Sequence, residues 1–251
     1  MLATSGISSW RFPPASLCLE NDEVHVWRAS LALTTPRIQS LLQTLSPEER
    51  RRAERFRFQK HLRCYIVARG LLRTILGGYL GLEPYELEFC YNSYGKPALT
   101  KTFGGETFRF NLSHSYDIAL YTIANRREVG VDIERIRLDF AYEEIAEKFF
   151  SPREIAALRA LSPSMRQEAF FACWTRKEAY IKARGEGLTL RLDQFDVTLA
   201  PGEPALLLGA NGDQQEASRW SLRTLTPGPG YVAALAVEGH DWRLKCWQWP
   251  D

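Results

Sequence analysis

The stretch YIVARG at residues 65–70 recurs, with one substitution, as YIKARG at residues 180–185. A Ser-Pro pair, which is typical of a helix start, lies upstream of each copy, at residues 46–47 and 151–152. Strand-like segments follow both copies. Matching flanks make two similar halves a better explanation than chance. We therefore predict an α+β fold whose two similar α+β halves are related by pseudo-twofold symmetry.

The spacing of hydrophobic residues along the rest of the chain predicts helices and strands that are consistent with two halves. A 3.6-residue period predicts helices over 59–79, 141–149, 152–160 and 164–183. Short β-branched or aromatic runs predict strands over 23–33, 86–91, 107–112, 118–124 and 128–134, and further strands within 195–249. We expect an irregular N-terminal arm over 1–22, a first half over 23–125 and a second half over 126–251.

Composition sets limits on the class of protein. The 251 residues include 45% hydrophobic residues and carry a formal net charge of +2, which gives no argument for a nucleic-acid partner. The five cysteines form no Cys-x-x-Cys pair, and no apolar run approaches the ~20 residues of a membrane span. We expect a soluble cytoplasmic protein without a membrane partner. Because fused halves already supply a cleft between them, we expect it to act as a monomer.

The segment VGVDIE at 129–134 is the first candidate for chemistry. On a strand, Asp132 and Glu134 lie on one face, while Val131 and Ile133 lie on the other, toward a core. Neighbouring carboxylates repel each other unless they are solvated or share a cation. A solvated strand end and a cation site are both open on this evidence.

A helical segment, WTRKEAYIK at 174–182, is the second candidate. Trp174, Glu178 and Lys182 recur at four-residue spacing on one helix face, and Lys177 lies beside them. An ordinary surface Glu–Lys pair with Trp174 as a core anchor explains the pattern equally well, and such pairs contribute only ~0.3–0.5 kcal/mol. The lysine that replaces the valine of the first copy, Lys182, favours the second half as the seat of the chemistry.

Two further segments carry polar groups that suit an anion. FNLSHS at 110–115 places His114 between two serines at the end of an alternating strand. Adjacent strand residues point to opposite faces, so a contact to phosphate is more plausible there than a Ser–His nucleophile, and a capped turn is the plainer alternative. Gly95 and Pro97 form a turn that projects Lys96 outward, although most turn lysines have no specific role.

In this order along the chain, the four segments resemble the Sfp-type 4′-phosphopantetheinyl transferase family. Its hallmark is (V/I)-G-(V/I)-D-x-E followed some forty residues later by W-x-x-K-E-(A/S)-x-x-K, here at 129–134 and 174–182. The family's G-K-P turn and N-(I/L)-S-H segment match residues 95–97 and 111–114. The resemblance runs from about residue 46 to 188 and is strongest to cyanobacterial members.

The resemblance implies a transferase that moves the 4′-phosphopantetheine arm of coenzyme A to a serine of an apo acyl or peptidyl carrier protein. It assigns Asp132, Glu134 and Glu178 to a magnesium ion, which prefers oxygen ligands and substrate phosphates. It assigns Glu178 and Lys182 to catalysis, Glu178 as the base for the carrier serine, acting directly or through a metal-bound water, and Lys182 as a stabiliser of phosphoryl charge. The other product is adenosine 3′,5′-bisphosphate.

Coenzyme A carries a pyrophosphate and a 3′-phosphate, so the resemblance also implies a set of mostly basic contacts. The implied coenzyme A residues are Arg52, Lys96, Asn111, Ser113, His114, Lys177 and Lys182. Two positions depart from the family pattern: Glu49 stands where some members carry lysine, and Tyr116 where many carry glycine. A non-catalytic coenzyme A or carrier-binding module and a metal-dependent nucleotide hydrolase are the alternatives.

Overall fold

Four strands form the sheet of the first half. The computed structural model describes residues 8–137, 139–210 and 212–250, so residues 1–7 of the expected arm and Asp251 lie outside it. In this sheet β1 pairs in parallel with β11 and antiparallel with β5, which pairs antiparallel with β4. The strand order is β11 (Arg243–Gln248), β1 (Glu23–Ser30), β5 (Ile118–Asn125) and β4 (Phe108–Ser115).

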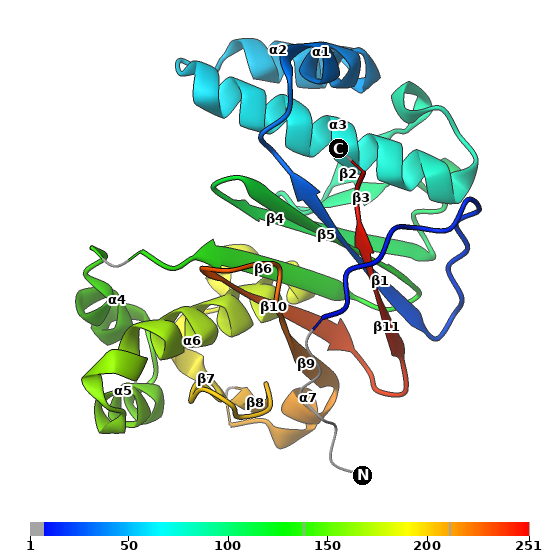
Figure 1. Cartoon of the computed structure of the whole chain (residues 1–251). Coiled ribbons are helices and arrows are strands. Elements are labelled where there is room, and N and C mark those ends of the chain that lie inside the picture. The colour runs from blue at the N-terminus through cyan, green and yellow to red at the C-terminus, as the bar shows by residue number, and fades with distance from the viewer. Residues whose placement is uncertain (1–7, 138, 211, 251) are drawn as a thin grey trace.

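Three helices cover one face of this sheet (Figure 1). They are α1 (Thr35–Thr44), α2 (Pro47–Glu54) and α3 (Gln59–Leu80). The long helix predicted over 59–79 is confirmed as α3, and its apolar face packs with Trp27, Tyr121 and Ile123 of the sheet into one buried cluster. Helix α1 was not predicted. It begins at a Thr-Pro pair without a side-chain cap.

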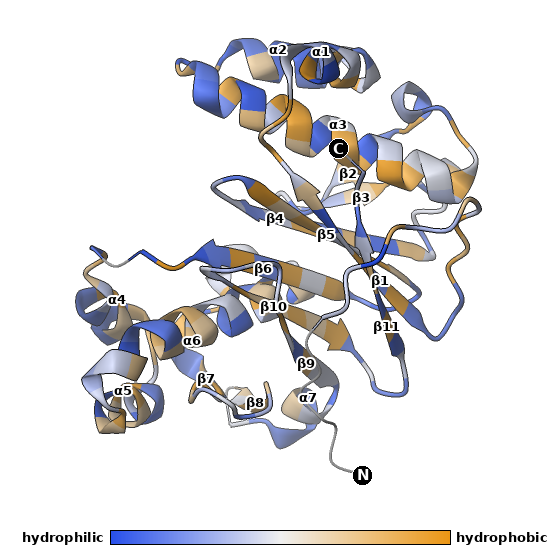
Figure 2. Cartoon of the chain, viewed as in Figure 1, coloured by the Kyte–Doolittle hydropathy of each residue, from blue (hydrophilic) through white to orange (hydrophobic). Residues whose placement is uncertain are grey.

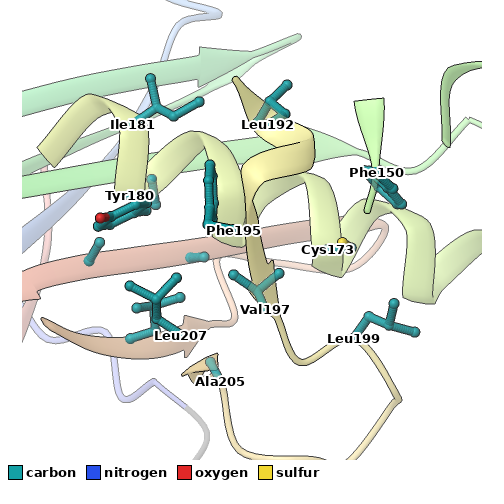
Figure 3. Packing of buried hydrophobic residues seen from close by; sticks show 14 of the residues in the cluster. Phe150, Cys173, Tyr180, Ile181, Leu192, Phe195, Val197, Leu199, Ala205 and Leu207 are labelled. Atoms are coloured by element: carbon teal, nitrogen blue, oxygen red, sulfur yellow. The ribbon is translucent and has the colours of Figure 1, made fainter. Parts of the chain in front are cut away.

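The second half is built on a three-stranded antiparallel sheet of order β6 (Val129–Arg135), β10 (Tyr231–Glu238) and β9 (Trp220–Leu225). Helix α6 (Pro163–Arg184) lies against β6 and β10 and confirms the helix predicted over 164–183. Its buried side chains, among them Tyr180 and Cys173, pack with Phe195 and Val197 (Figure 3). The remaining elements of this half are α4 (Tyr142–Phe149), α5 (Pro152–Ala160), β7 (Phe195–Val197), β8 (Leu207–Ala210) and α7 (Gln214–Ser218).

The two sheets face each other across a shared apolar layer. Val24 and Leu120 of the first sheet belong to the same buried cluster as Val131, Ile133 and Leu235 of the second. Apolar residues accordingly follow the strands between the helical layers (Figure 2). Because strand neighbours point to opposite faces, Asp132 and Glu134 face away from this layer, on the side of β6 that α6 covers.

A capping box opens a short helix in each half and anchors it to the long one. The side chains of Ser46 and Ser151 each accept a backbone N–H three residues on, from Glu49 and Glu154. Each glutamate is buried and also pairs with a cation of the long helix, which is Arg73 in α3 at 2.6 Å. In α6 the matching cation is Lys177, whose Nζ lies 2.8 Å from Glu154 Oε2.

The repeated hexapeptide does not occupy equivalent places in the two long helices. Gly70 lies inside α3, whereas Gly185 ends α6 at φ +70°, as Gly81 ends α3 at φ +66°. The structural correspondence therefore follows the helix ends and the capping boxes rather than the YIVARG and YIKARG stretches. The pseudo-twofold relation itself stays a prediction.

The C-terminus departs from the expected division of the chain. Strand β11 leaves the second half and pairs in parallel with β1, from Glu23 opposite Arg243 to Arg28 opposite Gln248. The first sheet thus contains residues from beyond the expected boundary at 125/126. Within the described residues, no helix has the combination of length and apolarity that crossing a membrane requires.

Candidate functional site

Side chains of β4 bridge to β6 along the seam where the edges of the two sheets meet. Asn111 Oδ1 accepts the backbone N–H of Val131 at 3.0 Å, and Ser113 Oγ donates to Asp132 Oδ1 at 2.8 Å. Asn111 and Ser113 are two residues apart on a strand and so share one face. Both were predicted to contact coenzyme A. Here they hold the strand that carries the acidic pair.

Ser115 continues this pattern and was not predicted. Its hydroxyl donates to Glu134 Oε2 at 2.9 Å and accepts the backbone N–H of Arg135 at 3.1 Å. The hydrogen bond fixes the direction of the Glu134 carboxylate. The alternation that singles out Asn111 and Ser113 was the available signal, because Ser115 is the next residue on the same face of the strand.

Lys182 reaches the acidic pair from helix α6. Its Nζ lies 2.6 Å from Asp132 Oδ1 and donates to Ser113 Oγ at 2.9 Å. Asp132 is 3% exposed, and its second oxygen, Oδ2, is buried without a hydrogen-bond partner among the described residues. Buried carboxylate oxygens are normally satisfied, so this oxygen is available to accept a further partner.

Glu178 lies one helical turn before Lys182, and the charges of Lys182 and Asp132 both affect its pKa. Burial, followed by the charge of Asp132, raises the pKa of Glu178. Burial and Asp132 also raise the pKa of Glu134, against the lowering effect of Ser115 and Lys182. The charge of Asp132 therefore affects the pKa of both Glu134 and Glu178. In the described chain, however, no three acidic, histidine or cysteine side chains are gathered closely enough to chelate an ion as they stand.

The close contact between α6 and β6 depends on Gly130. A Cβ atom at this position would lie 2.1 Å from the carbonyl oxygen of Ala179 and 2.3 Å from the backbone nitrogen of Ala183. Only glycine allows the helix backbone to approach the strand this closely. Gly130 thus sets the separation between Asp132 on the strand and Glu178 on the helix.

Lys177 lies away from the site, contrary to the role predicted for it with coenzyme A. Its side chain is 0% exposed, and its Nζ lies 2.8 Å from Glu154 Oε2 and donates to the carbonyl oxygen of Leu192 at 2.7 Å. It is the cation that completes the second capping box, as Arg73 does in the first half. One residue along a helix turns the side chain by about 100°, and this takes Lys177 to a different face from Glu178.

Trp174 is a core anchor, as one of the two interpretations of its segment held. Its ring lies 6.1 Å from that of Phe170 in a stacked arrangement and 5.9 Å from that of Phe149, edge to face. These contacts fix the middle of α6 against α4. They leave the last two turns, with Glu178 and Lys182, to face the seam.

Arg52 and His114 line one pocket of about 340 Å³ on the first half. Burial and the nearby charge of Lys182 lower the pKa of His114, which favours the neutral ring. The pocket walls include the aromatic rings of Phe56, Tyr65 and Tyr91. Such walls with a few polar groups are typical of a small-molecule site.

A second hollow, of about 430 Å³, adjoins the pocket along the arginine-rich helix α2. It is lined by Glu48, Arg51, Arg52, Arg55 and Phe56, so Arg52 belongs to both hollows. Glu49, the departure from the family pattern, is buried and held by Arg69 and Arg73. It is part of the capping box and does not face either hollow.

Lys96 is not among the residues that line the pocket, although its neighbours Gly95 and Pro97 are. Its Nζ donates to the carbonyl oxygen of Ala183 at 2.8 Å and lies 3.0 Å from Glu128 Oε2. The predicted contact to coenzyme A is therefore replaced, in this structure, by contacts to the end of α6.

Comparison with known proteins gives the same family for both halves. A family model described as "4′-phosphopantetheinyl transferase superfamily" matches residues 128–236, and one described as "4′-phosphopantetheinyl transferase, N-terminal" matches residues 27–125. The 4′-phosphopantetheinyl transferase HetI of a Nostoc species is 43% identical over 241 residues, which are 96% of this chain and 98% of HetI. This relative confirms the resemblance to cyanobacterial members.

Two bacterial relatives match over shorter stretches. The 4′-phosphopantetheinyl transferase Sfp of Bacillus subtilis is 28% identical over 78% of this chain and 84% of its own length. The 4′-phosphopantetheinyl transferase AcpT of Salmonella typhimurium is 37% identical over 57% of this chain and 68% of its own. With a relative as similar and as fully covered as HetI, the chain belongs to the 4′-phosphopantetheinyl transferase family, in its Sfp-type branch.

Proposed function

We propose that this chain transfers 4′-phosphopantetheine from coenzyme A to a serine of an apo carrier protein, with a magnesium ion held by Asp132, Glu134 and Glu178. The observation that carries the proposal is that the charge of Asp132 acts on both Glu134 and Glu178, while Asp132 Oδ2 is buried and unpartnered among the described residues. Carboxylate oxygens without nearby cysteine or histidine ligands suit magnesium better than zinc.

The donor set suits the ion in its chemistry, and binding would require the three carboxyl groups to move closer together and Lys182 to release Asp132. In this structure the ammonium of Lys182 neutralises the carboxylate that magnesium would bind. Burial first, and then the charge of Asp132, raises the pKa values of Glu134 and Glu178, and a divalent cation would favour the charged form of both. When bound, the ion would supply charge stabilisation for the pyrophosphate of coenzyme A.

Proton removal from the carrier serine is assigned to Glu178. In the metal-free protein, burial and the charge of Asp132 raise its pKa, which makes the carboxylate a stronger proton acceptor. The serine oxygen then forms a bond to the β-phosphorus as the bond to the bridging oxygen breaks, and adenosine 3′,5′-bisphosphate leaves. Lys182, once free of Asp132, would stabilise the charge on the phosphoryl oxygens. Phosphoryl transfer of this kind requires positioning and electrostatics rather than a protein nucleophile.

The nucleotide of coenzyme A is assigned to the pocket of Arg52 and His114. The Arg52 guanidinium lies 5.7 Å from the ring centre of Tyr65, so a cation and aromatic surfaces are close together. A base and a phosphate group need this combination. Asn111 and Ser113 would act mainly by holding β6, although Ser113 also lies next to Lys182.

Three features of the chain bear on its oligomeric state, its compartment and its partners. The halves already form the seam within one chain, which supports action as a monomer. All five cysteines are free thiols, which supports a reducing cytoplasmic compartment. The net charge of +2 gives no support for a nucleic-acid partner.

The test is a carrier-loading assay with coenzyme A, an apo carrier protein and Mg²⁺, followed by intact-protein mass spectrometry. We expect a mass gain of one phosphopantetheine on the carrier, which EDTA abolishes and Asp132→Asn reduces by at least a hundredfold. Coenzyme A binding without transfer would overturn the proposal in favour of a binding module. Release of adenosine 3′,5′-bisphosphate without a carrier would favour a hydrolase.

A further inference from the structure

The turn that joins β2 (Phe89–Tyr91) to β3 (Pro97–Leu99) reaches from the first half to the end of α6. Asn92 opens this turn. Its Oδ1 accepts the backbone N–H groups of Tyr94 at 3.0 Å and Lys96 at 2.9 Å, and its Nδ2 donates to the carbonyl oxygen of Gly185 at 2.7 Å. One side chain thus shapes the turn and ties it to the helix.

Lys96, at the other end of the turn, makes a second tie. Besides its bond to Ala183 O, its ammonium pairs with Glu128, whose other carboxylate oxygen accepts from Arg109 Nε at 2.6 Å. The Lys96 side chain is only 16% exposed. Its donors are thus directed to acceptors on the second half rather than to solvent.

These hydrogen bonds provide donors for carbonyl groups that are generally left unpaired at the end of a helix. The last four carbonyl groups of a helix have no partner within it, and a cation near them is favoured by the helix dipole. At the end of α6, the carbonyl of Ala183 in the last turn and that of the capping residue Gly185 receive their donors from the first half. Lys182 directly precedes Ala183, so the clamped backbone is the one from which Lys182 extends.

We propose that Asn92 and Lys96 are positioning residues that clamp the C-terminal turn of α6 and thereby place Lys182 for the transfer reaction. The proposal rests on the proposed function, and it replaces a direct contact between Lys96 and coenzyme A. The same hairpin supplies Tyr91, Gly95 and Pro97 to the pocket. The clamp therefore fixes the pocket wall and the catalytic helix relative to each other.

The test compares Lys96→Met and Asn92→Ala with Lys101→Met, a matched control whose side chain is 87% exposed on the same half. We expect kcat to fall about tenfold in both clamp variants, which is the factor that the loss of about 1.4 kcal/mol of transition-state stabilisation gives. Dissociation constants for coenzyme A and for 3′-dephospho-coenzyme A, measured by calorimetry, should change by the same factor, because no contact to the 3′-phosphate is lost. Lys101→Met should change neither.

A direct contact between Lys96 and the 3′-phosphate of coenzyme A would give a different result. In that case Lys96→Met would weaken coenzyme A binding at least tenfold and leave 3′-dephospho-coenzyme A unaffected, and Asn92→Ala would keep its activity. That pattern, or unchanged kcat in both clamp variants, overturns the proposal.

Hydrogen exchange gives a readout that needs no activity. We expect amides over 181–187 to exchange faster in both clamp variants and to keep wild-type rates in the control. Unchanged exchange overturns the clamp even where the enzyme is active. A wild-type protein that does not load a carrier, with faster exchange in the variants, would instead refute the proposed function and leave the clamp standing.

Discussion

Lys182 Nζ lies 2.6 Å from Asp132 Oδ1 and so joins the end of helix α6 to β6, the edge strand at the seam. A charge-assisted hydrogen bond of this length is among the stronger polar contacts in a protein. It leaves Asp132 Oδ2 buried and unpartnered among the described residues. In this state the lysine ammonium stands beside the carboxylate that is assigned to a metal ion, so the lysine and the ion compete for it.

Removal of Lys182 should therefore strengthen metal binding in the absence of coenzyme A. We expect Lys182→Met to bind Mn²⁺, a spectroscopic substitute for Mg²⁺, about tenfold more tightly, because a hydrogen bond to a charged group contributes about 1.5–3 kcal/mol. Electron paramagnetic resonance titration of free Mn²⁺ measures this. Lys148→Met, which removes an exposed lysine of α4, is the control. Equal or weaker Mn²⁺ affinity in Lys182→Met would rule out the competition.

The ion pair between Lys177 and Glu154 should support stability rather than substrate binding. Lys177→Met leaves Glu154 buried and without its cation, and loss of one partner of a buried pair costs about 3–5 kcal/mol. Urea denaturation should show this loss, and Glu154→Gln in the same chain should restore part of it. Coenzyme A affinity of the folded variant should match wild type. A large loss of affinity with normal stability would return Lys177 to the coenzyme A site.

The sequence alone was sufficient for the long helices and for the acidic strand. The 3.6-residue period placed α3 and α6 to within a residue or two, because an apolar helix face is a local signal. The two-residue period placed Asp132 and Glu134 on one face and Val131 and Ile133 in a core, as found. These are consequences of backbone geometry and need no tertiary information.

Contacts between residues that lie far apart in the sequence could not be predicted from local patterns. A strand pattern does not say which strand it pairs with, so the return of β11 to the first sheet was not foreseen. The motif spacing puts Lys177 next to Glu178, but the buried Glu154 that attracts Lys177 lies on another helix. In the same way, Lys96 is a turn residue whose acceptors, the carbonyl of Ala183 and the carboxylate of Glu128, come from elsewhere in the chain.

The raised pKa of Glu178 predicts a pH dependence of stability in the metal-free protein. A carboxyl group whose pKa is raised by folding binds its proton more tightly in the folded state, so stability falls as the pH rises above the unfolded value of 4.5. Glu178→Gln removes this cost. We expect the variant in EDTA to melt at a higher temperature than wild type at pH 7.5 and at about the same temperature at pH 4. A difference that is larger at pH 4 would contradict the shift. Added Mg²⁺ should raise the melting temperature of wild type only.

Gly130 should tolerate no side chain, because the added Cβ would meet the backbone of α6 rather than a flexible side chain. The carbonyl oxygen of Ala179 would lie 2.1 Å from it, so Gly130→Ala must push the helix away from the strand. Overpacking of this kind costs about 1–3 kcal/mol and more where the backbone has to move. Gly209→Ala is the matched control, since nothing lies within 4 Å of a Cβ at that strand position. We expect urea denaturation to show a loss of at least about 3 kcal/mol for Gly130→Ala and little change for Gly209→Ala. In whatever fraction remains folded, displacement of α6 carries Glu178 and Lys182 away from Asp132, so carrier loading should fall further than the folded fraction does. Activity in proportion to the folded fraction would show that the separation of helix and strand does not set the geometry of the site.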